Sequence, residues 1–271
     1  MVERMIDFFQ QPFMVRALAA GAIAGFLLPL LGNFLIPKKL SLLGDASSHF
    51  VFASLAVSAL VGLSSGVLSY PMAVVAVFGM LQMVKGLKMA GDQALAVFLA
   101  LGGATASLAI SSGSRINLNA VLFGSVFLVE LDDLLAGVAI ASLTGFFVIK
   151  KFREIVIFTV NEELARVRGV PVKLYELLLA AVSGLSIVAG VKIAGILLVT
   201  ALLVLPAVSI SLVATSMKKA ITLSIAIGES CIFAGIVSSY YTGMAPGAST
   251  VYILLAIFAM SGALMKKGIK I

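Results

Sequence analysis

The sequence predicts an all-α integral membrane protein that crosses a lipid bilayer about nine times. Of its 271 residues, 61% are hydrophobic and only 11% are charged, and the mean hydropathy is +1.18. A soluble domain is typically about 45–50% apolar and about 25% charged, so a water-soluble core cannot bury this excess. Membrane lipid is therefore the expected surroundings, and helices are favoured because they satisfy their backbone polar groups internally.

A membrane-spanning helix needs about 20 mainly apolar residues. By that rule we expect spans near 14–36, 50–68, 71–84, 93–112, 133–149, 174–190, 193–214, 220–239 and 248–265. The apolar piece from Leu118 to Val129 is too short to cross, so it is predicted to be a re-entrant or interfacial helix. We expect residues 1–271 to form a single transmembrane domain.

Lysine and arginine residues are unevenly distributed over this topology. Fifteen of the 19 fall on one side, and the other four are Arg4, Arg16, Arg115 and Lys192. The richer side of a membrane protein normally faces the cytoplasm. We therefore expect a multi-pass protein of the cytoplasmic (inner) membrane, with its N-terminus outside and its C-terminus in the cytoplasm. The net charge of +7 has the same origin, and no nucleic-acid partner is expected.

The cytoplasmic loop 150–173 contains a short sequence with the features of a complete helix, NEELARVRG. Asn161 is the predicted N-cap, and Glu162 and Glu163 form an acidic first turn. Arg166 and Arg168 lie near the C-terminal end, and Gly169 and Pro171 terminate the helix. A helix with such defined ends, in a loop that need only connect two spans, indicates a docking element. An ordinary basic loop that follows the orientation rule is the alternative.

Asp45 and His49 form the candidate metal site. His49 is the only histidine, and it follows Asp45 by four residues, so a helix would place both side chains on one face. A carboxylate and an imidazole together suit Zn²⁺, Mn²⁺ or Fe²⁺. The alternative is a helix-capping or interfacial role. Two ligands are too few for a metal site, and a homodimer around a central pathway would supply four.

Other acidic residues are weaker candidates for contact with a cation. Glu229 lies near the middle of a predicted span, where an ionisable group costs at least ~2.5 kcal/mol, so a pathway-lining or structural role is expected. It could instead be protonated or hydrogen-bonded to Ser224, Ser230 or another helix. At the outer boundary, Glu130, Asp132 and Asp133 either attract cations or are simply solvated acids.

Several stretches resemble the permease subunits of the ABC-3 family of metal-ion ABC importers. They are LSLLGDASSH (40–49), the LFG at 122–124, VNEELARVRGVPV (160–172), VKIAGILLVTALLVLPAVSIS (191–211) and SSYYTGMAPGAST (238–250). The resemblance runs from about residue 14 to 265. Two positions depart from the family pattern: Asn161 replaces the usual aspartate, and Gly243 and Met244 occupy a position that is usually acidic.

This resemblance implies a type II ABC importer-like permease that takes up Zn²⁺, Mn²⁺ or Fe²⁺ delivered by an extracytoplasmic metal-binding protein. It implies that Asp45 and His49, which match the family's GDALSH motif, contact or gate the ion. It also implies that the 161–169 helix docks on a separate ATPase subunit through Asn161, Glu162, Glu163, Ala165, Arg166 and Gly169. The sequence has no Walker A motif, so we expect neither catalytic residues nor a cofactor in this chain.

Three other functions compete with this interpretation. A permease for metal chelates or siderophores has a similar architecture but lacks the GDASSH and NEELARVRG pair in this form. An ion-coupled secondary transporter needs several intramembrane charges, whereas this sequence offers chiefly Glu229. A membrane enzyme is disfavoured because the sequence contains no HExxH, no GxSxG and no clustered histidines.

Overall fold

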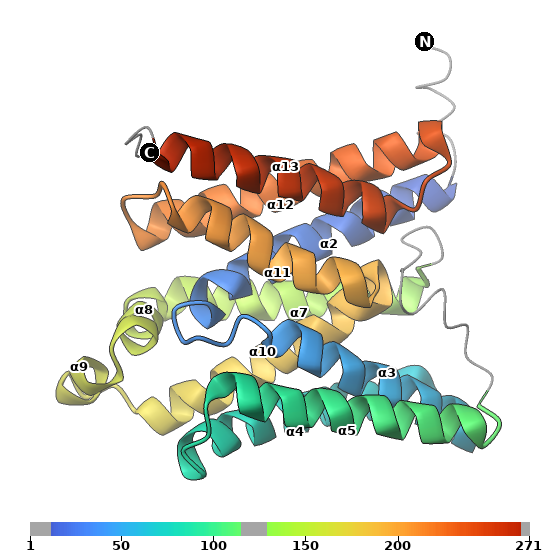
Figure 1. Cartoon of the computed structure of the whole chain (residues 1–271), viewed down its shortest axis with the longest axis horizontal. Helices are drawn as coiled ribbons and strands as arrows, with labels where there is room; N and C mark the ends of the chain where they lie inside the picture. The colour runs from blue at the N-terminus through green and yellow to red at the C-terminus, as the bar shows by residue number, and fades with distance from the viewer. Residues whose placement is uncertain (1–11, 115–128, 267–271) are drawn as a thin grey trace.

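A computed structural model describes residues 12–114 and 129–266, and these residues form helices joined by short connections, with no strand among them (Figure 1). In chain order the helices are α2 (Pro12–Leu35), α3 (Leu43–Val61), α4 (Ser65–Gly86), α5 (Gly91–Ser111), α7 (Leu131–Lys150), α8 (Phe152–Val160), α9 (Glu162–Val167), α10 (Val172–Ala194), α11 (Ile196–Ser211), α12 (Met217–Thr242) and α13 (Pro246–Lys266).

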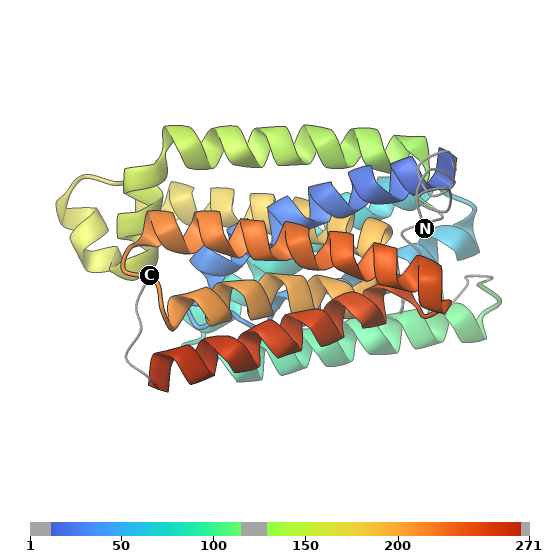
Figure 2. The same cartoon turned by 90° about the horizontal axis from the view of Figure 1, so that it is seen from above.

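The long helices lie roughly side by side, with their ends at the two ends of the molecule (Figures 1 and 2). α10 is the most enclosed of the long spans, with 72% of its apolar window buried, and it packs against α2, α4 and α7. α13 has only 17% of its window buried and lies at the periphery. A helix bundle in lipid has this distribution because apolar side chains on outer helices face acyl chains at no cost.

The predicted all-α polytopic class is confirmed. Eight of the described helices are long and apolar enough to span a membrane, and α11 is a shorter apolar helix of 16 residues. Together they correspond to the nine predicted spans. The predicted short helix at 118–129 lies outside the described residues, apart from Val129, which is buried.

The second span differs from its prediction, because α3 covers 43–61 rather than 50–68. Hydropathy placed it too late, since the stretch Gly-Asp-Ala-Ser-Ser-His is polar and does not resemble a membrane helix. In the structure Gly44, Ser47 and Ser48 are buried against other helices, and the Ser48 hydroxyl donates to the carbonyl of Gly44 at 2.6 Å. Gly62, with a φ of 77°, then ends the helix.

α10 and α11 are separated by one residue, Gly195. Its φ of 79° and ψ of 164° are accessible to glycine and strained for residues with a Cβ atom. The chain therefore reverses direction within a very short turn, and α11 runs back beside α3 and α13. This reversal places α11 next to the start of α3, where the candidate metal residues lie.

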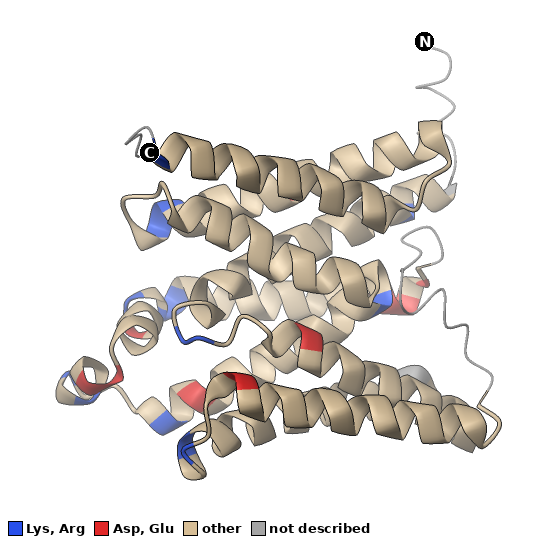
Figure 3. Ribbon diagram, in the orientation of Figure 1, with Lys and Arg blue, Asp and Glu red and all other residues tan. Residues whose placement is uncertain are grey.

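The lysines and arginines of the described residues lie at the two ends of the bundle, whereas acidic segments also occur within it (Figure 3). Most lysines and arginines of the described residues lie at the end that also carries α8 and α9 (left in Figure 3). The last turn of α10, which contains Lys192, and the start of α2, which contains Arg16, lie at the opposite end, as the sequence predicts (Figures 1 and 3). We refer to the first end as the basic end.

Candidate functional site

The candidate metal residues lie inside the bundle rather than at its surface end. After α2, residues 36–42 turn back toward the bundle, with Lys39 at a φ of 59° and a backbone hydrogen bond from Leu40 to Leu35 of 3.1 Å. α3 therefore begins further from the basic end than the points at which α4 ends and α5 begins (Figure 1). Asp45 lies in its first turn and is the acidic segment of α3 in Figure 3.

Asp45 and His49 share one face of α3, four residues apart, and both are half-exposed. The neighbouring face is packed: a Cβ atom on Gly44 would lie 3.3 Å from Leu203 and 3.8 Å from Thr200 of α11. Among the described residues, neither the Asp45 carboxylate nor the His49 imidazole has a hydrogen-bond or ion-pair partner. Both candidate metal ligands are thus partly accessible and without another polar partner among the described residues.

Gly102 of α5 fixes the position of α3 at His49. A Cβ atom at Gly102 would lie 2.9 Å from the carbonyl carbon of His49 and 3.0 Å from the backbone nitrogen of Phe50. Only glycine allows the two helix backbones to approach this closely. The ring of Phe98, one turn earlier on α5, stacks at a tilt on Phe50 with centroids 5.2 Å apart.

α11 carries a stripe of accessible residues at helical spacing, and Thr200 in this stripe lies beside Gly44 at the start of α3. The stripe consists of the exposed Leu197 and the half-exposed Thr200, Ala201, Val204 and Val208. α13, α11, α3 and α5 follow one another across this face, each in contact with the next (Figure 1), and α5 and α13 both lie along the lower edge of Figure 2. Within the part of the chain that the structure describes, no group of three or more His, Cys, Asp or Glu side chains gathers anywhere. One copy therefore offers two candidate metal ligands at this face.

Glu229 is not brought to the Asp45 and His49 pair. It is half-exposed on α12, and its carboxyl carbon would lie 3.2 Å from a Cβ atom on Gly25 of α2. Of the two serines considered as partners, Ser224 instead donates to the backbone carbonyl of Ala220 at 2.6 Å. Glu229 is thus placed at a close α2–α12 contact, on the far side of α11 from α3.

The predicted docking helix is present as α9, beyond the basic end of the bundle (left in Figure 1). The side chain of Asn161 accepts a hydrogen bond from the backbone of Leu164 at 2.9 Å, as an N-cap does. Gly169 ends the turn with a φ of 76°. Ala165 is completely buried against the bundle, whereas Val167 is 85% and Leu164 44% exposed. Glu163 and Arg166 are also exposed.

Glu162 connects α9 to the segment that precedes Asp45. Its carboxylate accepts hydrogen bonds from Lys38 at 2.7 Å and from Lys85 of α4 at 2.9 Å. Lys85 also pairs with Glu176 of α10 at 3.1 Å, and the Lys38 ammonium lies 3.6 Å from the centre of the Phe158 ring. Lys38 is only 10% exposed. This polar cluster ties four parts of the chain together at the basic end.

Burial and charge act in opposite directions on the pKa values in this cluster. Burial lowers the pKa of Lys38, although the hydrogen bond and charge of Glu162 oppose that effect. Burial would raise the pKa of Glu162, but the hydrogen bonds and charges of Lys38 and Lys85 together bring it below its ordinary value. The lowered pKa of Glu162 keeps its carboxylate charged near neutral pH, as an ion pair requires.

The model of the ABC 3 transport family matches residues 10–265, nearly the whole chain. The chain belongs to the ABC 3 transport family. It is 28% identical to the manganese transport system membrane protein MntC of Listeria monocytogenes over 92% of this chain and 89% of that protein. It is 30% identical to the high-affinity zinc uptake system membrane protein ZnuB of Buchnera aphidicola over 89% of this chain and 94% of that protein.

Solved structures share the fold of this chain. PsaBC from Streptococcus pneumoniae in complex with Fab superimposes with a TM-score of 0.85 at 26% identity, covering 96% of this chain and 95% of that chain. An inward-facing conformation of a putative metal-chelate type ABC transporter superimposes with a TM-score of 0.67 at 17% identity, covering 92% and 84%. The second likeness concerns the fold alone.

Some residues of this ABC 3 family protein have contacts that sequence reasoning missed. In the sequence, Lys38, Lys85 and Lys192 indicated only the orientation of the spans in the membrane. The structure pairs Lys192 with Asp133 at 2.7 Å and places it 5.7 Å from the Tyr70 ring centre. Asp133 is therefore an ion-pair partner, neither a free cation attractor nor a solvated acid. No sequence spacing indicated these pairs, because Lys38 and Glu162 are 124 positions apart.

Proposed function

We propose that this chain is the membrane permease subunit of an ATP-binding-cassette importer that takes up a divalent metal ion, Zn²⁺, Mn²⁺ or Fe²⁺. The observation that carries the proposal is the pair of Asp45 and His49 on one open face of α3, inside the membrane-spanning bundle. Membership of the ABC 3 transport family supports the transport role, and relatives named for manganese and zinc transport support the class of cargo.

The chemistry of the pair suits a transported ion. A carboxylate oxygen and an imidazole nitrogen are a mixed donor set that suits Mn²⁺, Fe²⁺ and Zn²⁺. Since an ion in transit must leave again, a set with open positions is better than a closed cage. Charged and polar groups within a span are costly, and their position facing an open side supports a pathway role.

A second copy of the chain would complete the site. Each copy supplies Asp45 and His49, so a homodimer with these faces opposed would surround the ion with two carboxylates and two imidazoles. The half-exposed stripe of α11 beside the pair supports this assembly, because it would line the same central pathway. The ion would then be exchanged between α3 and α11 of both copies.

The energy for transport would come from a separate ATPase subunit on the cytoplasmic side. α9 supports this assignment, since it protrudes from the bundle and exposes Leu164 and Val167, two apolar side chains outside the membrane-spanning helices. A short helix with an apolar exposed side fits a groove of a partner protein. We assign the basic end to the cytoplasm, which places the N-terminus outside, where an extracytoplasmic binding protein would deliver the ion.

The polar cluster at the basic end offers a route from the ATPase to the metal pair. When an ATPase moves α9, Glu162 would pull on Lys38, which lies in the 36–42 segment just ahead of α3. Because that segment leads directly into the first turn of α3, the movement would reach Asp45 and His49. Lys85 and Glu176 would anchor the same cluster to α4 and α10.

Metal uptake into proteoliposomes that contain the permease, its ATPase subunit and its binding protein tests the proposal. Asp45→Ala and His49→Ala should abolish uptake of ⁶⁵Zn²⁺ or ⁵⁴Mn²⁺ while leaving assembly and ATP hydrolysis measurable. Asp92→Ala, which removes an exposed carboxylate from the first turn of α5, is the matched control and should transport normally. Normal uptake by the Asp45→Ala/His49→Ala double variant would contradict the proposal.

Transport of a metal chelate is the alternative. A chelator already saturates the metal, so a chelate needs no carboxylate and imidazole inside the span, and Asp45 and His49 favour the bare ion. The same proteoliposomes distinguish the two cargoes. Uptake of the chelated metal at the rate of the free ion, unaffected by the alanine variants, would support the chelate.

A further inference from the structure

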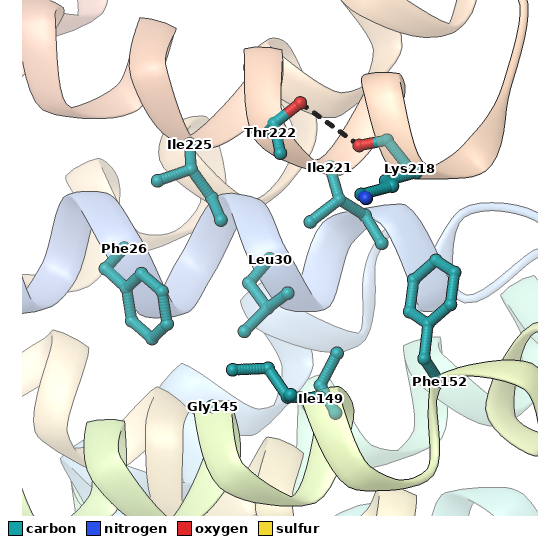
Figure 4. Close-up of a pocket in the computed structure, with 10 residues that line it drawn as sticks. Phe26, Leu30, Gly145, Ile149, Phe152, Lys218, Ile221, Thr222 and Ile225 are labelled. Atoms are coloured by element: carbon teal, nitrogen blue, oxygen red, sulfur yellow. Dashed lines mark hydrogen bonds between the residues drawn. The ribbon is translucent and has the colours of Figure 1, made fainter.

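A groove of about 480 Å³ lies between α7 and α12, with α2 as its floor (Figure 4). Its surface is almost entirely apolar. Phe26 and Leu30 of α2 form the floor, Ile149 of α7 forms one wall, and Ile221 and Ile225 of α12 form the other. The volume falls within the ~300–1,000 Å³ that is usual for small-molecule sites.

The groove faces away from the proposed metal pathway. α7 lies at the opposite edge of the molecule from α5 and α13, which border the Asp45 and His49 face (Figure 2). A second copy placed over Asp45 and His49 would therefore leave the groove uncovered. Because its walls belong to membrane-spanning helices, the surroundings of the groove are lipid, and the available occupant is an acyl chain.

One end of the groove is charged. Lys218, in the first turn of α12, lies at the basic end beside Phe152 of α8 (Figure 4). Among the described residues Lys218 forms no ion pair, unlike Lys38, Lys85 and Lys192. A lysine at the boundary of a membrane span attracts the phosphate group of an anionic lipid. The groove thus combines an apolar channel with the Lys218 ammonium, which lies at the boundary of the membrane span.

We propose that this groove is a binding site for an anionic phospholipid, with one acyl chain between α7 and α12 and the phosphate group on Lys218. The apolar walls fix the chain, and the single cation selects a net negative headgroup over a zwitterionic one. Gly145 of α7 lines the groove without a side chain, and a Cβ atom there would lie in ordinary van der Waals contact with the Phe26 ring, at 3.4 Å. This site stands independently of the metal proposal.

Native mass spectrometry of the detergent-purified protein tests the site, with phosphatidylglycerol and phosphatidylcholine as probes. Lys218→Gln should reduce the preference for phosphatidylglycerol about fivefold, which is the contribution expected of one basic residue near an anionic headgroup. Lys219→Gln is the matched control: it removes the neighbouring exposed lysine, which does not line the groove, and should keep the wild-type preference.

A second variant tests the channel itself. Gly145→Leu should fill the groove and reduce retention of both lipids, and circular dichroism would verify that the helices are intact. Equal phosphatidylglycerol preference in Lys218→Gln and Lys219→Gln would overturn the headgroup assignment. Wild-type lipid retention by Gly145→Leu would overturn the acyl-chain assignment, and a wild-type protein that binds both lipids equally would overturn the anionic selectivity.

Discussion

The contact between Gly102 and His49 shows how strongly one atom can matter at the candidate metal site. His49 keeps its position because the α5 backbone lies directly on the α3 backbone at this point. The neighbouring Gly103 has the same residue type and the same helix, but no atom lies within 4 Å of the Cβ atom that it would carry. Substituting each of these two adjacent glycines therefore distinguishes the effect of packing from the effect of helix propensity.

Gly102→Ala is expected to destabilise the protein relative to Gly103→Ala. Both changes gain the same helix propensity, but at Gly102 the methyl group meets backbone atoms that cannot move aside without separating α5 from α3. Overpacking of this kind costs about 1–3 kcal/mol. Thermal unfolding in detergent and metal uptake measure the effect, which should be absent in Gly103→Ala. Equal melting temperatures for the two variants would contradict this account of the contact.

At the scale of elements, the link between α9 and the segment before α3 gives a specific prediction for coupling. Lys38→Met keeps the apolar stem but removes the ammonium that contacts Glu162 and the Phe158 ring, and Glu162→Gln removes the charge of the other partner. Each change should lower the metal transported per ATP hydrolysed several-fold. Because both variants break the same contact, the double variant should be little worse than either single one.

Metal uptake and ATP hydrolysis are measured in the same proteoliposomes for wild type, the two single variants and the double variant. Multiplicative losses in the double variant would show that Lys38 and Glu162 act separately and would contradict the coupling route. Unchanged coupling in both single variants would contradict it as well. Melting temperatures distinguish a coupling defect from simple loss of the fold.

The same ion pair predicts an acid-side dependence of stability. The pKa of Glu162 lies below its ordinary value of 4.5 in the folded protein, so the unfolded chain binds a proton more readily than the folded one. Its stabilising contribution is therefore present above about pH 4.5 and is lost as the pH falls through the lowered pKa. Wild type should lose more thermal stability than Glu162→Gln over this range. Parallel losses in the two proteins would contradict the prediction.

At the scale of the whole molecule, the proposed dimer predicts which face lies near a second copy. Thr200→Cys on the α11 stripe should give a cross-linked dimer with a short bis-maleimide in membranes. Val138→Cys, which places an exposed thiol on α7 at the opposite edge, is the control and should not. The single native cysteine, Cys231, is buried, so wild type should not react. Cross-linking through Val138 but not Thr200 would place the second copy on the other face.

The sequence alone was sufficient to identify the family and the existence of each long helix, although it placed the start of α3 too late. Long apolar runs identify membrane spans because backbone polar groups in lipid must be hydrogen-bonded within the helix. Helices such as α10 and α12 can therefore be recognised from their own sequence, without knowledge of the helices that pack against them. Asn161 and Gly169 likewise identify α9 locally, since a cap and a left-handed terminator act within one turn. The resemblance to the ABC-3 permeases followed from ordered motifs along the chain and is confirmed by the family match.

Only the tertiary structure decided where α3 begins and what its residues face. The polar stretch from Gly44 to His49 is helical because it is buried against α11 and α5, and hydropathy does not include those neighbours. The pairs Lys38–Glu162 and Lys192–Asp133 join distant segments, so no local pattern indicates them. In lipid, the local apolar sequence determines which long segments are helical. The depth and the partners of the few charged residues depend instead on how those helices pack.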